Sequence, residues 1–75
     1  MNAVVEVEIA SDQEHEKVVA EVLVDGKFVC IVSNDYDELL VELPGPGLDE
    51  NLVARTVSLE NLLRGIELAK SRLAV

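Results

Sequence analysis

Two side chains of this sequence have the chemistry of catalytic or metal-binding groups, His15 and Cys30. A cysteine nucleophile needs a base or a cation that stabilises its thiolate, but Cys30 lies in the apolar run 29–32. A zinc site needs several ligands, and the sequence has no second histidine or cysteine. Glu14 and Glu16 flank His15 and should make it hold its proton more tightly. We therefore interpret Cys30 as a buried hydrophobic residue and His15 as a loop residue, and predict no catalytic or metal site.

Acidic residues are frequent, and their number explains why so many of them are close neighbours. Fifteen of the 75 residues are Asp or Glu, so adjacent acids arise by chance and do not by themselves indicate acid–base catalysis. The run 35–38 lacks the central glycine and the late acid of an EF-hand calcium loop. Gly45-Pro46-Gly47 is not followed by the Lys-Ser or Lys-Thr of a phosphate-binding loop. We predict no cofactor and no enzymatic activity.

The net charge of −9 restricts the partners that the protein can have. Residues 1–50 contain thirteen acids and two lysines, a charge of −11, whereas residues 51–75 carry +2. Nucleic acids and anionic membranes attract basic surfaces, so we expect neither as a partner. The N-terminus has no pattern of a secretion signal and no apolar stretch is long enough to span a bilayer. With a single cysteine, the expected location is the cytoplasm.

The length predicts one domain that spans residues 1–75. A chain of this size buries only about 60% of its unfolded surface, so its core is small. A lone cysteine cannot form an internal disulfide, which leaves tight apolar packing or association with another chain as the source of extra stability. The hydrophobic content of 49% is consistent with packing and argues against a disordered acidic chain.

Alternating and β-rich segments predict a sheet over residues 3–43. Residues 3–9 alternate between apolar and acidic side chains, as in a half-buried strand. Residues 17–24 and 27–33 flank Asp25-Gly26, a pair that favours a two-residue type I′ hairpin turn. An uninterrupted register places Leu23 opposite Phe28, Val22 opposite Val29 and Glu21 opposite Cys30. Residues 37–43 follow a turn and predict a fourth strand, with Glu42 near Lys27 if the turn has an even number of residues.

The second half of the chain predicts a breaker and then a helix. Pro44 and Pro46 lie in the breaker loop 44–48, because proline cannot donate to a sheet. Residues 48–57 fit either a fifth strand or a helical turn. Residues 58–73 have helical spacing of leucines, with Ser58 as N-cap and cations in the last turns. Gly65 interrupts this helix at a cost, which indicates close packing against the sheet.

These elements predict an α+β fold: an antiparallel meander of four, possibly five, strands followed by one C-terminal helix packed on one face. Both faces of the central hairpin are largely apolar in sequence, yet one helix can cover only one of them. The sequence leaves open which face that is. The other face must close on itself, meet a second copy or meet a partner, since large exposed apolar patches are unusual on monomers.

The leading functional hypothesis is a non-enzymatic, acidic protein-binding module. Its general layout, an acidic meander followed by one helix, resembles that of small bacterial immunity proteins and antitoxins. The acidic, partly apolar surface favours a basic protein partner, for example a nuclease or another toxin that binding would neutralise. The alternative is a homodimeric structural or regulatory domain. The residues expected at the partner surface are Val29, Ile31, Tyr36, Glu38, Leu40 and Glu42.

Overall fold

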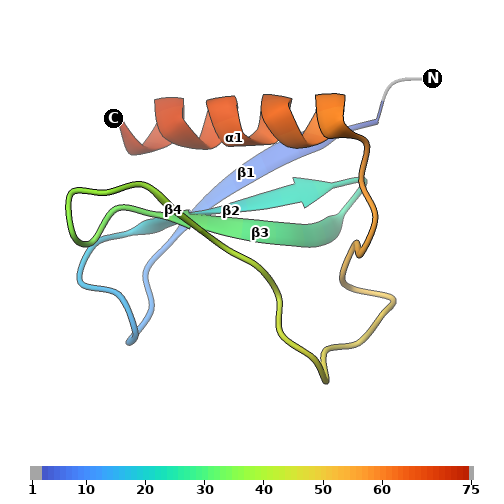
Figure 1. Cartoon of the computed structure of the whole chain (residues 1–75), viewed down its shortest axis with the longest axis horizontal. Coiled ribbons are helices and arrows are strands. Elements are labelled where there is room, and N and C mark those ends of the chain that lie inside the picture. Colours follow the sequence, from blue (N-terminus) through green and yellow to red (C-terminus); the bar gives the residue numbers. More distant parts are fainter. Residues whose placement is uncertain (1–2, 75) are drawn as a thin grey trace.

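A computed structural model of the chain describes residues 3–74 and confirms the predicted α+β architecture. The strands are β1 (Val5–Ala10), β2 (Val19–Val24), β3 (Lys27–Ser33) and β4 (Leu40–Glu42), and the helix is α1 (Leu59–Leu73). The sheet is antiparallel with the order β1-β2-β3-β4. Figure 1 shows two layers, with α1 on one side of the sheet and loops 11–18 and 43–57 on the other. The side without the helix is called the outer face below.

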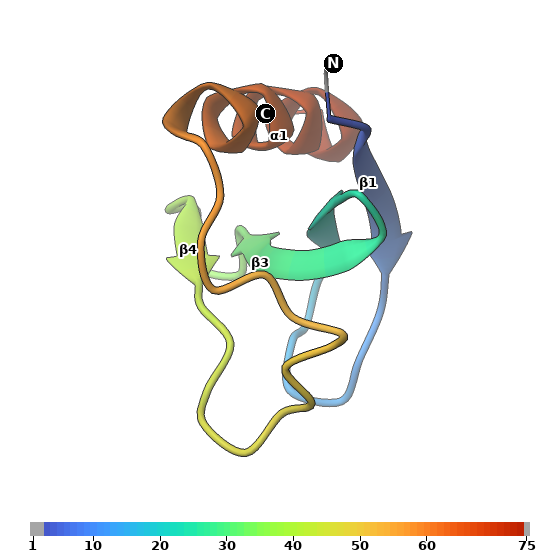
Figure 2. The ribbon, with the colours of Figure 1, turned by 90° about the vertical axis from the view of Figure 1, so that its right-hand side faces the viewer.

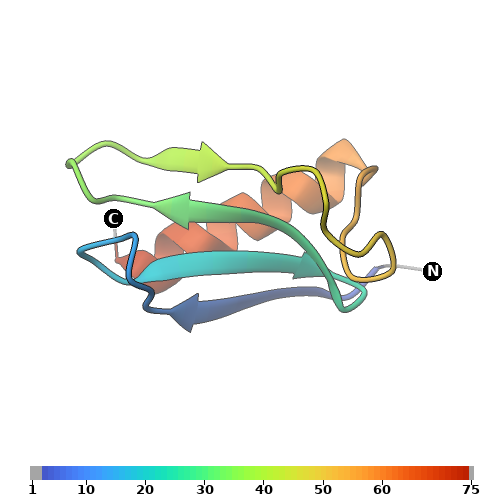
Figure 3. The same cartoon turned by 90° about the horizontal axis from the view of Figure 1, so that it is seen from below.

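The helix crosses the sheet obliquely and leaves the fourth strand uncovered. It packs against β1 and β2 and reaches part of β3 (Figure 3). Ser58 caps its first turn by accepting a hydrogen bond from the Asn61 amide at 3.1 Å, as the sequence predicts. Figure 2, viewed close to the helix axis, shows α1 as a layer of its own beside the sheet. In the part of the chain described, no helix is both long and apolar enough to cross a membrane.

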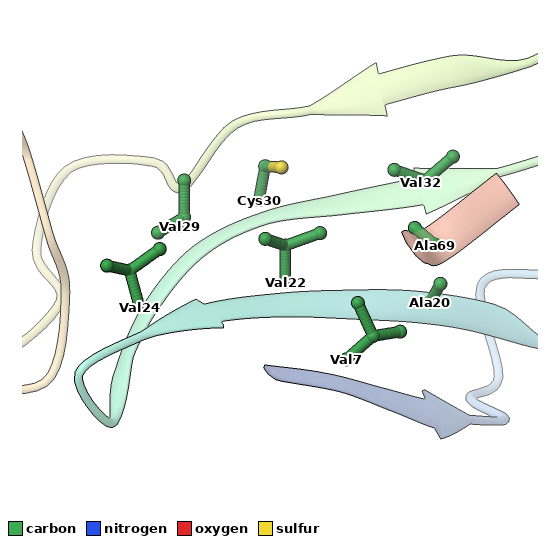
Figure 4. Close-up of a cluster of buried hydrophobic side chains, with 8 residues drawn as sticks. All are labelled: Val7, Ala20, Val22, Val24, Val29, Cys30, Val32 and Ala69. Atoms are coloured by element: carbon green, nitrogen blue, oxygen red, sulfur yellow. The ribbon is translucent and has the colours of Figure 1, made fainter. Parts of the chain in front are cut away.

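Close packing under the helix depends on Gly65. A Cβ atom placed there would lie 2.5 Å from Cγ1 of Val22 and 3.5 Å from Cγ1 of Val5. Val22 is completely buried, and burying a valine side chain contributes roughly 1.5 kcal/mol or more. Figure 4 shows Val22 among the buried side chains between sheet and helix. The core cluster consists of Val7, Ala20, Val22, Val24, Val29, Cys30, Val32 and Ala69.

The hairpin of β2 and β3 has the predicted turn, but its register changes after two residue pairs. Asp25 and Gly26 both have positive φ (52° and 80°), as a type I′ turn requires. Leu23 is opposite Phe28 as predicted, whereas Val22 is opposite Cys30 and not Val29. A β-bulge adds one residue to β3 here. The predicted pairs Val22–Val29 and Glu21–Cys30 are therefore wrong, and Cys30 lies in the core under the helix.

The remaining differences from the sequence prediction concern the ends of strands and the segment 48–57. β4 is only three residues long, and Glu42 is opposite Ile31, far from the predicted neighbour Lys27. Residues 49–52 form a turn, and Val53 then makes a single parallel bridge to Phe28. This bridge lies at the edge of β3, next to the bulge. Residues 48–57 therefore form a turn and a single bridge in place of the predicted fifth strand or helical turn.

Candidate functional site

The outer face carries a row of acidic residues that crosses the whole sheet. The strand register aligns Glu8 of β1 with Glu21 of β2, Glu21 with Ile31 of β3, and Ile31 with Glu42 of β4. Directly opposite residues of an antiparallel sheet share a face. Three carboxylates and one apolar side chain thus form one line across four strands. Glu6, two residues before Glu8, extends the acidic face along β1.

The pair Glu8 and Glu21 lacks any compensating cation within residues 3–74. The basic side chains lie elsewhere. Lys17 pairs with Asp37 in the loops, and Arg72 donates to the Val7 carbonyl from the helix. Like charges that face each other directly are destabilising in a sheet. The fold therefore keeps two like charges directly opposite each other on the outer face.

Apolar side chains lie beside the acidic row on the same face. Leu23 is opposite Phe28, and both are half-buried, as is Ile31. Phe28 is also bonded through its backbone to the segment 52–54, which borders this part of the face. The outer face thus combines an apolar centre with acidic residues around it, between two projecting loops (Figure 1).

His15 joins the first loop to the fourth strand. Its Nδ1 lies 2.8 Å from Oδ1 of Asp12 and its Nε2 lies 2.7 Å from Oε2 of Glu42. The hydrogen bond to Asp12, followed by that to Glu42, raises the pKa of His15 from 6.5 to about 9. The same bond lowers the pKa of Asp12. The expected direction of the His15 shift is confirmed, but its cause is these two residues and not the flanking Glu14 and Glu16.

This geometry decides what chemistry His15 can perform. At neutral pH the ring is an imidazolium that donates from both nitrogens, so it has no lone pair free to act as a base or to bind a metal. In the fold, His15 connects loop 11–18 to β4 through its ion pair with Glu42. Cys30 is completely buried, and burial raises the pKa of its thiol. No group of three or more His, Cys, Asp or Glu side chains in residues 3–74 is arranged so that it could hold a metal ion.

The structure brings together four of the six residues expected at a partner surface. Tyr36, Leu40 and Glu42 line one hollow that also includes His15, and Ile31 is the cross-strand neighbour of Glu42. Tyr36 is 81% exposed at the tip of the β3–β4 loop. Glu38 is exposed in the same loop, outside this hollow.

Val29 differs from the other expected surface residues because it is buried in the core. Only 5% of it is exposed, so a partner cannot reach it in this fold. Sequence reasoning in turn missed Glu8 and Glu21 as a pair. The alternation of residues 3–9 places Glu6 and Glu8 on one face, but their alignment with Glu21 follows only from the pairing of β1 with β2.

The chain matches no protein-family model, and no curated protein or solved structure is similar enough to match it. The functional argument therefore depends on the geometry of the outer face alone.

Proposed function

We propose that the protein is a non-enzymatic binding module whose outer face binds a basic surface of another protein. The observation that carries this proposal is the direct opposition of Glu8 and Glu21 without a cation of the described chain between them. A basic side chain of a partner would supply that cation. The repulsion that the free protein tolerates would then become attraction in the complex.

The layout of the face supports both fast encounter and specific binding. A surface of one charge sign accelerates association with a surface of the opposite sign. The half-buried apolar residues Leu23, Phe28 and Ile31 can then lose their remaining contact with water under the partner. Tyr36, Glu38, Leu40 and Glu42 extend this surface at its β4 side. Tyrosine is a common anchor of protein interfaces, and Tyr36 is exposed enough to act as one.

The same charges favour a protein partner over other classes of partner. DNA, RNA and anionic lipids would be repelled by the outer face. We propose a basic protein, such as a nuclease or another toxin that an immunity-like protein would neutralise. The free, buried Cys30 is compatible with the reducing cytoplasm as the site of action.

Affinity capture with two matched variants tests this proposal. The variant Glu8→Gln/Glu21→Gln removes two charges from the outer face, and Glu60→Gln/Glu67→Gln removes two from the helix. We expect the wild type and the helix variant to retain a stoichiometric basic protein from host lysate at low salt. The outer-face variant should lose it, although removal of the like-charge repulsion should make this variant slightly more stable.

Two results would contradict the proposal. Equal capture by both variants would show that the outer face is not the binding surface. Retention that does not weaken at high salt would show that charge attraction does not drive the binding.

A further inference from the structure

A small hollow lies on the outer face where loop 11–18 meets β4 and the loop 34–39 before it. Figure 3 shows these two loops side by side at one end of the sheet. The hollow has a volume of about 190 Å³. Sites for small molecules usually have about 300–1,000 Å³. The hollow is therefore too small for such a ligand and has the size for the end of one side chain of another protein.

Hydrogen bonds between the segments around the hollow form it in the free protein. The backbone amide of Lys17 donates to Oδ1 of Asp35 at 3.0 Å. His15 joins the same loop to Glu42 of β4 at 2.7 Å. These two contacts hold loop 11–18 in place before any partner binds, which reduces the entropy that binding costs.

A buried hydroxyl group lines the hollow and has no partner within the described chain. Ser33 is only 2% exposed, and its alternation with the core residue Val32 directs its side chain to the outer face. Its hydroxyl forms no hydrogen bond with a group of residues 3–74. Every side-chain nitrogen or oxygen of these residues that is fully shielded from solvent does have a partner, so the Ser33 oxygen must reach solvent through the hollow. A buried hydroxyl without a hydrogen bond costs free energy, which a ligand group bonded to it would recover.

The charges around the hollow favour a cation as that ligand group. Three carboxylates line it, those of Glu14, Asp35 and Glu42. His15 supplies one positive charge, but both of its ring nitrogens already bond to carboxylates, so no donor remains there for an anion. Glu14 forms no ion pair with a cation of the described chain. The net charge of the lining is thus negative, and one of its acids is unpaired.

We propose, on the basis of the binding function given above, that this hollow binds one arginine side chain of the basic partner. The five N–H donors of a guanidinium can bond to several acceptors at once, here the Ser33 hydroxyl and the carboxylates of Glu14 and Asp35. The planar group can also stack on the ring of Tyr36, which is 81% exposed beside the hollow. A lysine ammonium has only three donors on one atom and does not stack flat on a ring.

An NMR titration with a capped tripeptide, arginine between two glycines, tests the proposal without the partner. At constant ionic strength we expect saturable shifts of the backbone amides of Glu14, Ser33 and Tyr36, with a dissociation constant in the millimolar range. The same peptide with lysine in place of arginine should bind at least about 3-fold more weakly, because it offers fewer donors.

Two substitutions and one matched control show whether the hollow is the site. Glu14→Gln should weaken binding of the arginine peptide about 2- to 5-fold. Glu16→Gln, which changes an exposed acid of the same loop outside the hollow, should leave it unchanged. Ser33→Ala should weaken binding roughly 2- to 10-fold. This variant should nevertheless be at least as stable as the wild type in urea, since it removes a buried hydroxyl that has no partner.

Several outcomes would overturn the proposal. Shifts that do not saturate, or that spread over the acidic row at Glu8 and Glu21, would exclude the hollow as the site. Equal binding of the lysine peptide would exclude recognition of a guanidinium, and a destabilised Ser33→Ala would show that the hydroxyl serves the fold. Glu8→Gln/Glu21→Gln should bind the arginine peptide as the wild type does. Since the capture experiment depends on those two acids and this titration does not, each proposal can fail separately.

Discussion

At the scale of single residues, His15 gives the clearest pH dependence. Its pKa in the folded chain is about 9, above the value of 6.5 for a free histidine. The folded state therefore binds the proton more tightly, and this contribution to stability is complete below pH 6.5 and is lost as the pH rises to 9. We expect the urea midpoint of the wild type to fall between pH 6.5 and 9.

The variant His15→Gln separates this effect from other titrations. It removes the imidazolium that Asp12 and Glu42 bind, so its urea midpoint should change little between pH 6.5 and 9. Cys30 also has a raised pKa, but from a starting value of 9.0, so it acts above this range. If the urea midpoint falls equally with pH in the wild type and in His15→Gln, the ion pairs of His15 with Asp12 and Glu42 do not contribute to stability.

The environment of His15 also shows what sequence reasoning can and cannot provide about a site. The acidic neighbours in the chain correctly predicted the direction of the shift. Of its two partners, Asp12 is three residues away, whereas Glu42 is 27 residues away and becomes a neighbour only when loop 11–18 folds back onto β4. No local pattern contains that contact. Ile31 lies beside Glu42, as strand alternation predicts, and Tyr36 is exposed because it lies in the loop between β3 and β4.

At the scale of elements, the contact between α1 and the sheet is limited by Gly65. Gly65→Ala would improve helix propensity by about 1 kcal/mol, but the new Cβ would be placed 2.5 Å from the buried Val22. Overpacking of this kind costs about 1–3 kcal/mol, so we expect a net loss of stability of about 1 kcal/mol in urea denaturation. Ser71→Ala, on an exposed part of the same helix, is the control and should not destabilise.

A double-mutant cycle shows whether the loss comes from this contact. In the Val22→Ala background the space next to residue 65 is larger, so Gly65→Ala should cost less there than in the wild type. An equal cost in both backgrounds would locate the strain elsewhere in the helix.

The strands and the helix were largely predictable from the sequence, whereas one β-bulge changed which residues of β2 and β3 are opposite each other. The Asp25-Gly26 turn, the capped helix and the breaker loop follow from local residue preferences. The bulge in β3 follows from no such preference, because both Val29 and Cys30 suit a buried position. Its effect is to place Cys30, and not Val29, opposite Val22. A single extra residue thus moved Glu21 next to Ile31 and created the acidic row of the outer face.

At the scale of the whole molecule, charge is separated between the sheet and the helix. Residues 1–50 carry −11 and residues 51–75 carry +2, and the fold places the first group in the sheet and its loops.

The same separation of charge predicts how salt affects stability. Between 10 mM and 1 M NaCl the screening length falls from about 30 Å to about 3 Å, which removes most repulsion between exposed acids. We expect the thermal midpoint to rise with salt. The variants Glu8→Gln/Glu21→Gln and Glu60→Gln/Glu67→Gln both remove two acids, but only the first pair opposes each other. The rise of the thermal midpoint with salt should therefore be smaller in Glu8→Gln/Glu21→Gln than in Glu60→Gln/Glu67→Gln when both are measured at the same protein concentration. An equal rise of the thermal midpoint in the two variants would mean that the repulsion depends on the total charge of the protein and not on the acidic row.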